Sequence, residues 1–202
     1  MRKLYLFCVA VLALAAAQPA SAQFMWIDVN GDGFCDSQDV LDNTVTSIDL
    51  WLATNQDANF FPVTCPTGED LTINSYTFIL RSTGNVTFGA WTDAMGFGTN
   101  LGTGLAGNDR WVGRGSGNIQ PPGIYKLGSH AITVTGSPSI SIISSTTASS
   151  QALTSFGSAC LGTLGTNTMK LGLDWFDTCG TAGGTPVTDT TWGKIKALYR
   201  GD

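Results

Sequence analysis

Short runs of β-branched and aromatic residues, separated by glycine, proline, asparagine and serine, constrain the fold of this chain more than any other feature. The run SIDLWLAT shows the alternation of a half-buried strand. Its two faces carry Ile48, Leu50 and Leu52 on one side and Asp49, Trp51 and Ala53 on the other. Similar runs are LTINSYTFILRS, NVTFGAWT, GIYKLGSHAITVT, PSISIIS and MKLGLDWF. No long stretch keeps a helical period, so the pattern predicts an all-β, antiparallel β-sandwich over residues 46–180.

A glycine-rich segment from Met95 to Asn118 interrupts this pattern. It is too polar and too rich in glycine for a core strand, so we expect a long loop that is either functional or mobile. Trp111 lies in this segment and is the best candidate for an exposed ring that stacks on a ligand.

The first 22 residues predict a secretory signal peptide. Arg2 and Lys3 precede an apolar run over residues 4–17, and Ala20-Ser21-Ala22 forms a small-residue cleavage site. The apolar run is shorter than the roughly 20 residues that a membrane-spanning helix needs. We therefore expect a secreted or cell-surface protein with no membrane span.

The chain that remains is acidic. Of the 10 basic residues, Arg2 and Lys3 leave with the signal peptide, so 8 face 15 acidic residues and the net charge is −7. An acidic surface without basic clusters argues against nucleic acids and anionic membranes as partners.

Four cysteines remain as well: Cys35, Cys65, Cys160 and Cys179. An even number of cysteines in a secreted chain predicts two disulfides, for which three connectivities exist. We favour Cys65–Cys160 and Cys35–Cys179, which would tie an early loop and the N-terminal segment to the end of the domain. The long spacings without C-x-x-C argue against a zinc site.

The stretch DVNGDGFCDSQD, residues 28–39, has the composition of a metal site. A calcium loop of the EF-hand type needs side-chain oxygens at positions 1, 3, 5, 9 and 12, a backbone carbonyl at 7 and glycine at 6. In that order these positions hold Asp28, Asn30, Asp32, Asp36, Asp39, Phe34 and Gly33. Clustered carboxylates repel one another without a cation, and calcium prefers hard oxygen ligands. The sequence therefore predicts one bound Ca²⁺.

Only the five residues QFMWI separate the predicted cleavage site from Asp28, too few for the entering helix of a complete EF-hand. A loop with aspartate at position 12, followed by a short helix at DSQDVLDN, resembles the calcium repeat of bacterial dockerins over residues 26–42. The resemblance implies a calcium-binding unit at residues 23–45 and a bacterial source.

Dockerins carry two such repeats, whereas this chain has one. Asn55, Asp57 and Asn59 have the first ligand spacings of a second repeat, but Phe60 stands where the glycine belongs. These residues either form a polar turn, which we favour, or supply a ligand to the first ion.

The order of the β-rich runs over residues 46–176 is similar to that of cohesin-like and carbohydrate-binding-module-like domains. In such domains a PG-x-Y-x-L turn enters a central strand, and this chain has it at Pro122, Gly123, Tyr125 and Leu127. The resemblance implies a jelly-roll sandwich and a binding role rather than a reaction.

Catalytic motifs are missing from the sequence. His130, the single histidine, lies in a strand-like run, where a satisfied structural residue is the simpler interpretation. There is no G-x-S-x-G or H-E-x-x-H motif, and no GxGxxG that opens a helix. Glycoside hydrolysis needs two carboxylates on opposite sides of a bond, and the sequence offers no compelling pair. We therefore predict no catalytic residues.

The C-terminal residues 181–202 combine a flexible TAGGTPVTDTT linker with the amphipathic segment WGKIKALYR. This tail is either a helix that caps the sandwich or a detachable segment for sorting or assembly. Three hypotheses for the whole protein follow. The first is a non-catalytic, calcium-binding structural, adhesive or self-assembling protein, whose partners are other subunits, including copies of itself. The second is a carbohydrate-binding module for extracellular polysaccharide, and the third is a glycoside hydrolase.

Overall fold

The computed structural model describes residues 23–34, 38–57, 61–65, 68–147, 149–160 and 169–170. The predicted signal peptide and the C-terminal tail lie outside these residues. Within them the chain forms strands and turns without a helix, and every strand pair is antiparallel. No described segment is a helix long and apolar enough to span a membrane. The prediction of an all-β, antiparallel fold is confirmed.

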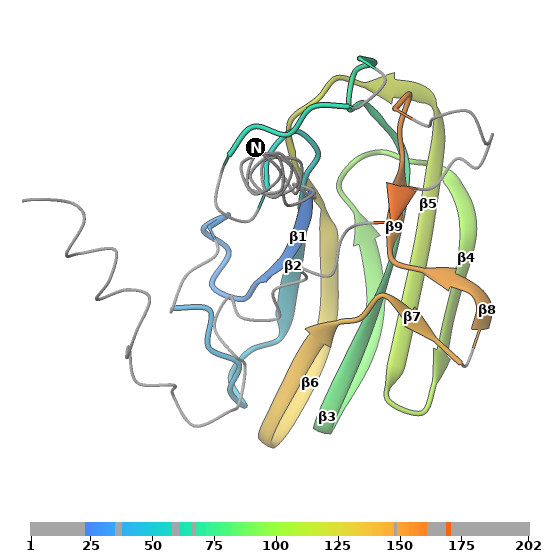
Figure 1. Cartoon of the computed structure of the whole chain (residues 1–202). Coiled ribbons are helices and arrows are strands. Elements are labelled where there is room, and N and C mark those ends of the chain that lie inside the picture. Colours follow the sequence, from blue (N-terminus) through green and yellow to red (C-terminus); the bar gives the residue numbers. More distant parts are fainter. Residues whose placement is uncertain are drawn as a thin grey trace, which may run out of the picture.

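The strands are β1 (Phe24–Asp28), β2 (Ser47–Ala53), β3 (Ile73–Asp93), β4 (Thr99–Ala106), β5 (Asp109–Gln120), β6 (Ile124–Ile142), β7 (Ser145–Thr146), β8 (Ser149–Leu153), β9 (Ser155–Gly157) and β10 (Met169–Lys170). One sheet has the order β1-β2-β6-β3-β5-β4, with β9 on β3 and β10 on β9; β7 and β8 form a separate pair. Figure 1 shows β1 and β2 on one side of the molecule and β4 and β5 on the other.

This sheet is folded over on itself. Arg110 pairs with Leu80 and His130 pairs with Trp91, eleven residues further along β3. A straight strand would separate those two positions by about 36 Å. Nevertheless Nε of Arg110 lies 3.1 Å from Nε2 of His130, so the two halves of the sheet face each other.

Two glycines mark the bend. The register between β3 and β6 shifts next to Gly84, and this residue and Gly136 have φ angles of 82° and 78°. Such angles are readily adopted only by glycine. A Cβ on Gly84 would lie 3.2 Å from Cα of Pro138, so the two strands also approach closely there.

The main core fills the space between the facing halves. Ile48, Leu50 and Leu52 belong to it and are at most 1% exposed. On the opposite face of β2, Trp51 packs against a smaller cluster that includes Trp26. The alternation predicted for this run is therefore confirmed.

The glycine-rich segment after Met95 is not a long loop, and our expectation for it was wrong. It forms the β4–β5 hairpin, and Val112 contributes a fully buried side chain to the core. The glycines are compatible with this hairpin because larger side chains lie over them. A Cβ on Gly104 would fall 2.0 Å from the Trp111 ring, and one on Gly113 would fall 3.2 Å from Leu101.

The short helix expected at DSQDVLDN is absent from its described part, residues 38–43. Local hydrogen bonds compete with a helix there. The amide of Val40 donates to the carbonyl of Gln38 at 2.8 Å, and the amide of Thr44 donates to Oδ1 of Asp42 at 2.7 Å. The backbone is therefore held in turns.

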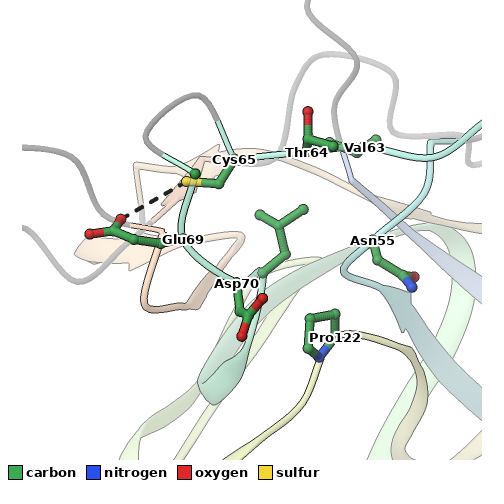
Figure 2. Close-up of a pocket in the computed structure, with 9 residues that line it drawn as sticks. Asn55, Val63, Thr64, Cys65, Glu69, Asp70 and Pro122 are labelled. Carbon is green, nitrogen blue, oxygen red and sulfur yellow. Dashed lines mark hydrogen bonds between the residues drawn. The ribbon is translucent and has the colours of Figure 1, made fainter.

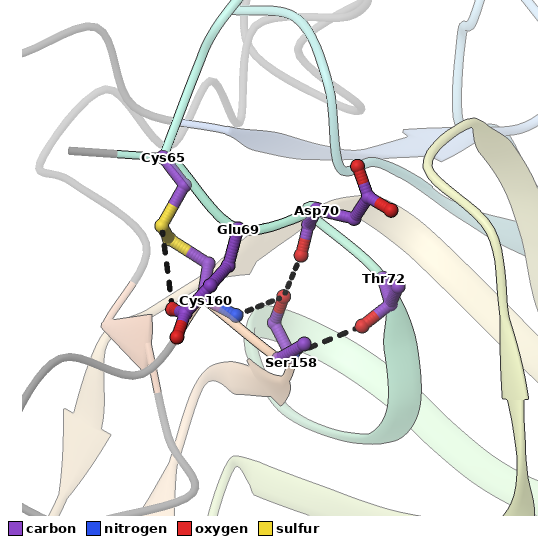
Figure 3. Close-up of a disulfide and its surroundings, with 7 residues drawn as sticks. Cys65, Glu69, Asp70, Thr72, Ser158 and Cys160 are labelled. Atoms are coloured by element: carbon purple, nitrogen blue, oxygen red, sulfur yellow. Dashed lines mark hydrogen bonds between the residues drawn. A yellow bond between two sulfur atoms is a disulfide. The ribbon is translucent and has the colours of Figure 1, made fainter. Parts of the chain in front are cut away.

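A disulfide joins Cys65 and Cys160, with Cα atoms 5.7 Å apart, as the sequence predicted (Figure 3). Both cysteines are buried with Val63 and Leu71 in a small cluster of their own. The other predicted pair, Cys35–Cys179, lies outside the described residues.

Candidate functional site

The loop that leaves β1 begins with a fully buried carboxylate. Asp28 is 0% exposed and accepts three hydrogen bonds. The amides of Gly31 and Gly33 donate at 2.7 and 2.8 Å, and the indole nitrogen of Trp51 donates at 3.1 Å. All three donors are neutral, so none of them offsets the negative charge.

The neighbouring carboxylate, that of Asp49, has a positively charged partner. Asp49 is the cross-strand partner of Asp28 in the β1–β2 pair. Its side chain forms an ion pair with Nζ of Lys126 at 2.5 Å and accepts a hydrogen bond from Ser129 at 2.6 Å. The fold therefore supplies a cation to Asp49, whereas the donors around Asp28 are amides and an indole.

Gly33 shapes the turn of the loop. Its φ of 82° is in the left-handed region, and a Cβ there would lie 3.1 Å from the Trp51 ring. Gly31 has a similar φ of 80° but open space around it. Only Gly33 is thus constrained both by its backbone angle and by a neighbour.

The exposed part of the loop consists of two successive turns closed by side chains. Oδ1 of Asn30 accepts a hydrogen bond from the amide of Asp32 at 3.0 Å, and Oδ1 of Asp32 accepts one from the amide of Phe34 at 2.8 Å. The Asn30 amide group also donates to Oδ2 of Asp32 at 3.0 Å. These bonds concentrate oxygen atoms on one short segment.

Asp39 brings the far end of the loop back to its start. It is also 0% exposed, and its Oδ1 accepts a hydrogen bond from the amide of Val29 at 2.6 Å. The first and last residues of the predicted calcium loop, Asp28 and Asp39, are therefore held close together.

Five of the six predicted metal ligands are described: Asp28, Asn30, Asp32, Phe34 and Asp39. Asp36 lies outside the described residues, as does Asn59. Within the described part, no group of three or more His, Cys, Asp and Glu side chains is arranged to hold a metal. Calcium also binds asparagine side-chain oxygens and backbone carbonyl oxygens, and two of the predicted ligands, Asn30 and Phe34, are of these kinds.

The segment with weak similarity to a second repeat forms a turn. The amide of Phe61 donates to Oδ1 of Asp57 at 3.0 Å, and the amide of Asp57 donates to the carbonyl of Phe61 at 3.0 Å. The amide of Val63 donates to the carbonyl of Asn55 at 2.9 Å. The described residues of this segment thus have the geometry of the polar turn that we favoured.

Trp51 is the residue that sequence reasoning missed. It contacts the loop through its indole N–H and lies 5.9 Å from Trp26, ring centroid to ring centroid, at an interplanar angle of 11°. Its position opposite Leu50 and Leu52 was predicted, but only the pairing of β1 with β2 brings its ring next to Asp28.

A pocket of about 300 Å³ lies beside the disulfide (Figure 2). Asn55 lines it, and Oδ1 of this residue is buried without a hydrogen bond. Oε2 of Glu69 lies 4.0 Å from Sγ of Cys65, which has no proton to donate because it is a disulfide sulfur. Glu69 and Asp70, which are adjacent in the sequence, both line this pocket.

His130 lies in the interior of the folded sheet. It is fully buried between the rings of Phe88 and Trp91, and Nε of Arg110 donates to its Nε2. Burial lowers the pKa of His130 to about 4, and the nearby positive charge of Arg110 acts in the same direction. The ring is therefore neutral at physiological pH.

Comparison of the chain with protein-family models, with curated proteins and with solved structures finds no match. The similarity to dockerins and to cohesin-like domains therefore stays a prediction. The functional proposal therefore rests on the geometry of the loop around Asp28.

Proposed function

We propose that this protein is a secreted, calcium-stabilised β-sandwich with a structural, adhesive or self-assembling role outside the cell. The observation that carries the proposal is the buried carboxylate of Asp28, whose donors among the described residues are all neutral and which stands at the start of an oxygen-rich loop. A buried charge is costly unless a counter-charge is close. A cation in the loop would supply it.

The residues fit calcium better than other metals. The loop offers carboxylate, amide and carbonyl oxygens and no histidine, which suits a hard cation that takes six to eight oxygen ligands. Asp28, Asn30, Asp32, Asp36 and Asp39, with the carbonyl of Phe34, would hold it. Each carboxylate or amide oxygen has two lone pairs, so an oxygen that accepts one hydrogen bond can still bind a metal.

The ion would hold the loop against β2. Asp28 ends β1, and Trp51 of β2 contacts both its carboxylate and Gly33. Calcium would therefore stabilise the edge of the folded sheet rather than a separate module. We further propose that the two facing halves of the sheet form a sandwich of the jelly-roll or cohesin type.

A binding or structural role is favoured over catalysis because two buried titratable groups, His130 and Asp109, are held by neighbouring side chains. His130 is buried and neutral, and Asp109 forms a bidentate pair with Arg81 at 2.7 and 2.8 Å. Carbohydrate binding is the alternative, and it requires exposed, coplanar rings. The rings of Trp26 and Trp51 are nearly parallel but stacked on each other instead of side by side, and Trp26 is only 3% exposed.

Isothermal titration calorimetry of the purified secreted chain with CaCl₂ tests the proposal. We expect one ion per chain, with an affinity between about 1 µM and 1 mM, the range from calcium sensors to extracellular modules. The Asp32→Ala variant should bind at least about tenfold more weakly. Asp70→Ala removes an exposed carboxylate from a different loop and serves as the matched control. Equal affinity in all three proteins would refute the site.

A further inference from the structure

Two positive charges of the fold have no counter-charge among the described residues. Four basic side chains are described, those of Arg81, Arg110, Arg114 and Lys126. Arg81 and Lys126 each form an ion pair with an aspartate, whereas Arg110 and Arg114 form none in the described part of the chain. Because the chain as a whole is acidic, two neighbouring arginines without a carboxylate indicate a site for a negatively charged ligand.

Both arginines lie on the inner face of β5, which is the face turned toward the other half of the folded sheet. Arg110 pairs with Leu80 of β3, and Arg114 pairs with Tyr76. Val112, halfway between the two arginines, belongs to the main core, so the alternation along β5 places all three side chains on this face. Each arginine is partly exposed and therefore within reach of a ligand.

Uncharged groups hold the two guanidinium groups in place. Nε of Arg110 donates to Nε2 of His130 at 3.1 Å, and its Nη1 donates to the carbonyl of Gly104 at 3.3 Å. Nη1 of Arg114 donates to Oδ1 of Asn100 at 2.8 Å and to the preceding backbone carbonyl at 2.9 Å. Since His130 is neutral at physiological pH, none of these acceptors offsets a positive charge.

The remaining N–H groups of Arg114 have the arrangement that binds a carboxylate. A guanidinium carries five N–H donors, and those on Nε and Nη2 of Arg114 have no acceptor among the described residues. These two nitrogens form one edge of the planar group, which can hold a carboxylate through two parallel hydrogen bonds. On Arg110, Nη2 likewise has no acceptor in the part of the chain that the structure describes.

The two positive charges are close enough to act on one ligand. Burial lowers the pKa of Arg110, and the positive charge of Arg114 lowers it further. One carboxylate, that of Asp93, lies in this neighbourhood, but it accepts hydrogen bonds from the hydroxyl of Tyr76 and from the amide of Phe97. A bound dianion would relieve the repulsion between the arginines.

We propose that Arg110 and Arg114 bind a ligand with two carboxylates on the inner face of β5. Arg114 holds one carboxylate through Nε and Nη2, and Arg110 holds the other through Nη2. The chemical class is a dicarboxylate, which is either a free organic acid or a pair of uronic-acid residues of a polysaccharide. This site shares no residue with the calcium loop and goes beyond the function proposed above.

Calorimetric titration of the purified secreted chain at low ionic strength tests the site, with succinate, adipate and digalacturonate as probes. We expect saturable binding of a dicarboxylate with a dissociation constant of about 1 mM or lower, and no binding of the neutral adipamide. Arg110→Gln and Arg114→Gln each remove one charge and should weaken binding at least about tenfold. Lys126→Gln is the matched control, because it removes a cation that is already paired with Asp49, and it should bind as the wild-type chain does.

Nuclear magnetic resonance of the ¹⁵N-labelled wild-type chain locates the ligand without a substitution. The Nε–H signal of Arg114 should shift on titration, whereas that of Arg81 should not, because Arg81 already binds Asp109. Tightest binding of digalacturonate would identify a polysaccharide as the source of the carboxylates, and tightest binding of succinate or adipate a free acid. Failure of all three probes to bind, or equal binding by the wild-type chain and Arg114→Gln, overturns the proposal.

Discussion

The indole nitrogen of Trp51 donates a hydrogen bond to Oδ2 of Asp28 across the β1–β2 pair, at 3.1 Å. The acceptor is a buried carboxylate, and the same indole ring lies against Gly33. One side chain of the sheet thus fixes both the first residue and the sharp turn of the proposed calcium loop.

Replacing Trp51 with phenylalanine should therefore destabilise the protein. The ring would remain, but Asp28 would lose a donor in a buried site, at a cost of about 1–3 kcal/mol in the free energy of unfolding. Urea denaturation measures this value. Trp91→Phe is the matched control, because the Trp91 indole donates to the neutral hydroxyl of Tyr76 and should cost less. Equal losses in the two variants would contradict the role given to Trp51.

The two loop glycines provide a second comparison. Gly31→Ala and Gly33→Ala both place a side chain at a φ near 80°, which costs about 1 kcal/mol. Only alanine at position 33 would also press on the Trp51 ring. We expect the Gly33→Ala variant to lose more stability and more calcium affinity than Gly31→Ala, as thermal unfolding and calorimetry would show. The reverse order would mean that the loop is not packed on Trp51.

Calcium removal should lower the melting temperature. A ligand that binds only the folded state stabilises it by about 2.7 kcal/mol at a free concentration of 100 times its dissociation constant. Calorimetric scans with calcium and with excess EGTA measure the shift. EGTA should lower the melting temperature of Asp32→Ala less than that of the wild-type chain, so an equal EGTA effect in the two proteins would place the ion elsewhere.

The disulfide between Cys65 and Cys160 should contribute strongly to stability. It closes a segment with a sequence separation of 95, for which the chain-entropy model gives about 4–5 kcal/mol. Replacing both cysteines with alanine should lower the free energy of unfolding by a value of this order. Peptide mapping of the unreduced wild-type chain checks the connectivity, and a Cys35–Cys65 peptide would contradict it.

Acid should destabilise the fold through His130. Its pKa is lowered by burial to about 4 in the folded chain, against about 6.5 when unfolded. Above pH 6.5 the ring is neutral in both states. As the pH falls from 6.5 to 4 the unfolded chain gains the proton first, so up to about 3 kcal/mol of stability is lost. His130→Gln keeps an acceptor for Arg110 without titrating, and its stability should change less over this interval.

Residue types and their spacing were enough to predict the strand faces and the position of the loop. The alternation in SIDLWLAT predicted which side chains enter the core, because successive residues of a strand point to opposite faces. Likewise, the positions of Asp28 and Gly33 predicted a tight oxygen-rich turn, because turn geometry depends on neighbours in the chain.

The pairing of strands in the folded chain determined the β4–β5 hairpin, the bend of the sheet and the contact between Trp51 and Asp28. Leu101 and Trp111 lie over glycines of a neighbouring strand, and these cross-strand contacts made a hairpin of a segment whose composition indicated a loop. One bend, marked by Gly84 of β3 and Gly136 of the paired strand β6, brings Arg110 to His130. The contact of Trp51 with Asp28 likewise depends on the register of two strands. The sequence alone carries little information on such contacts, because they depend on which strands pair and in which register.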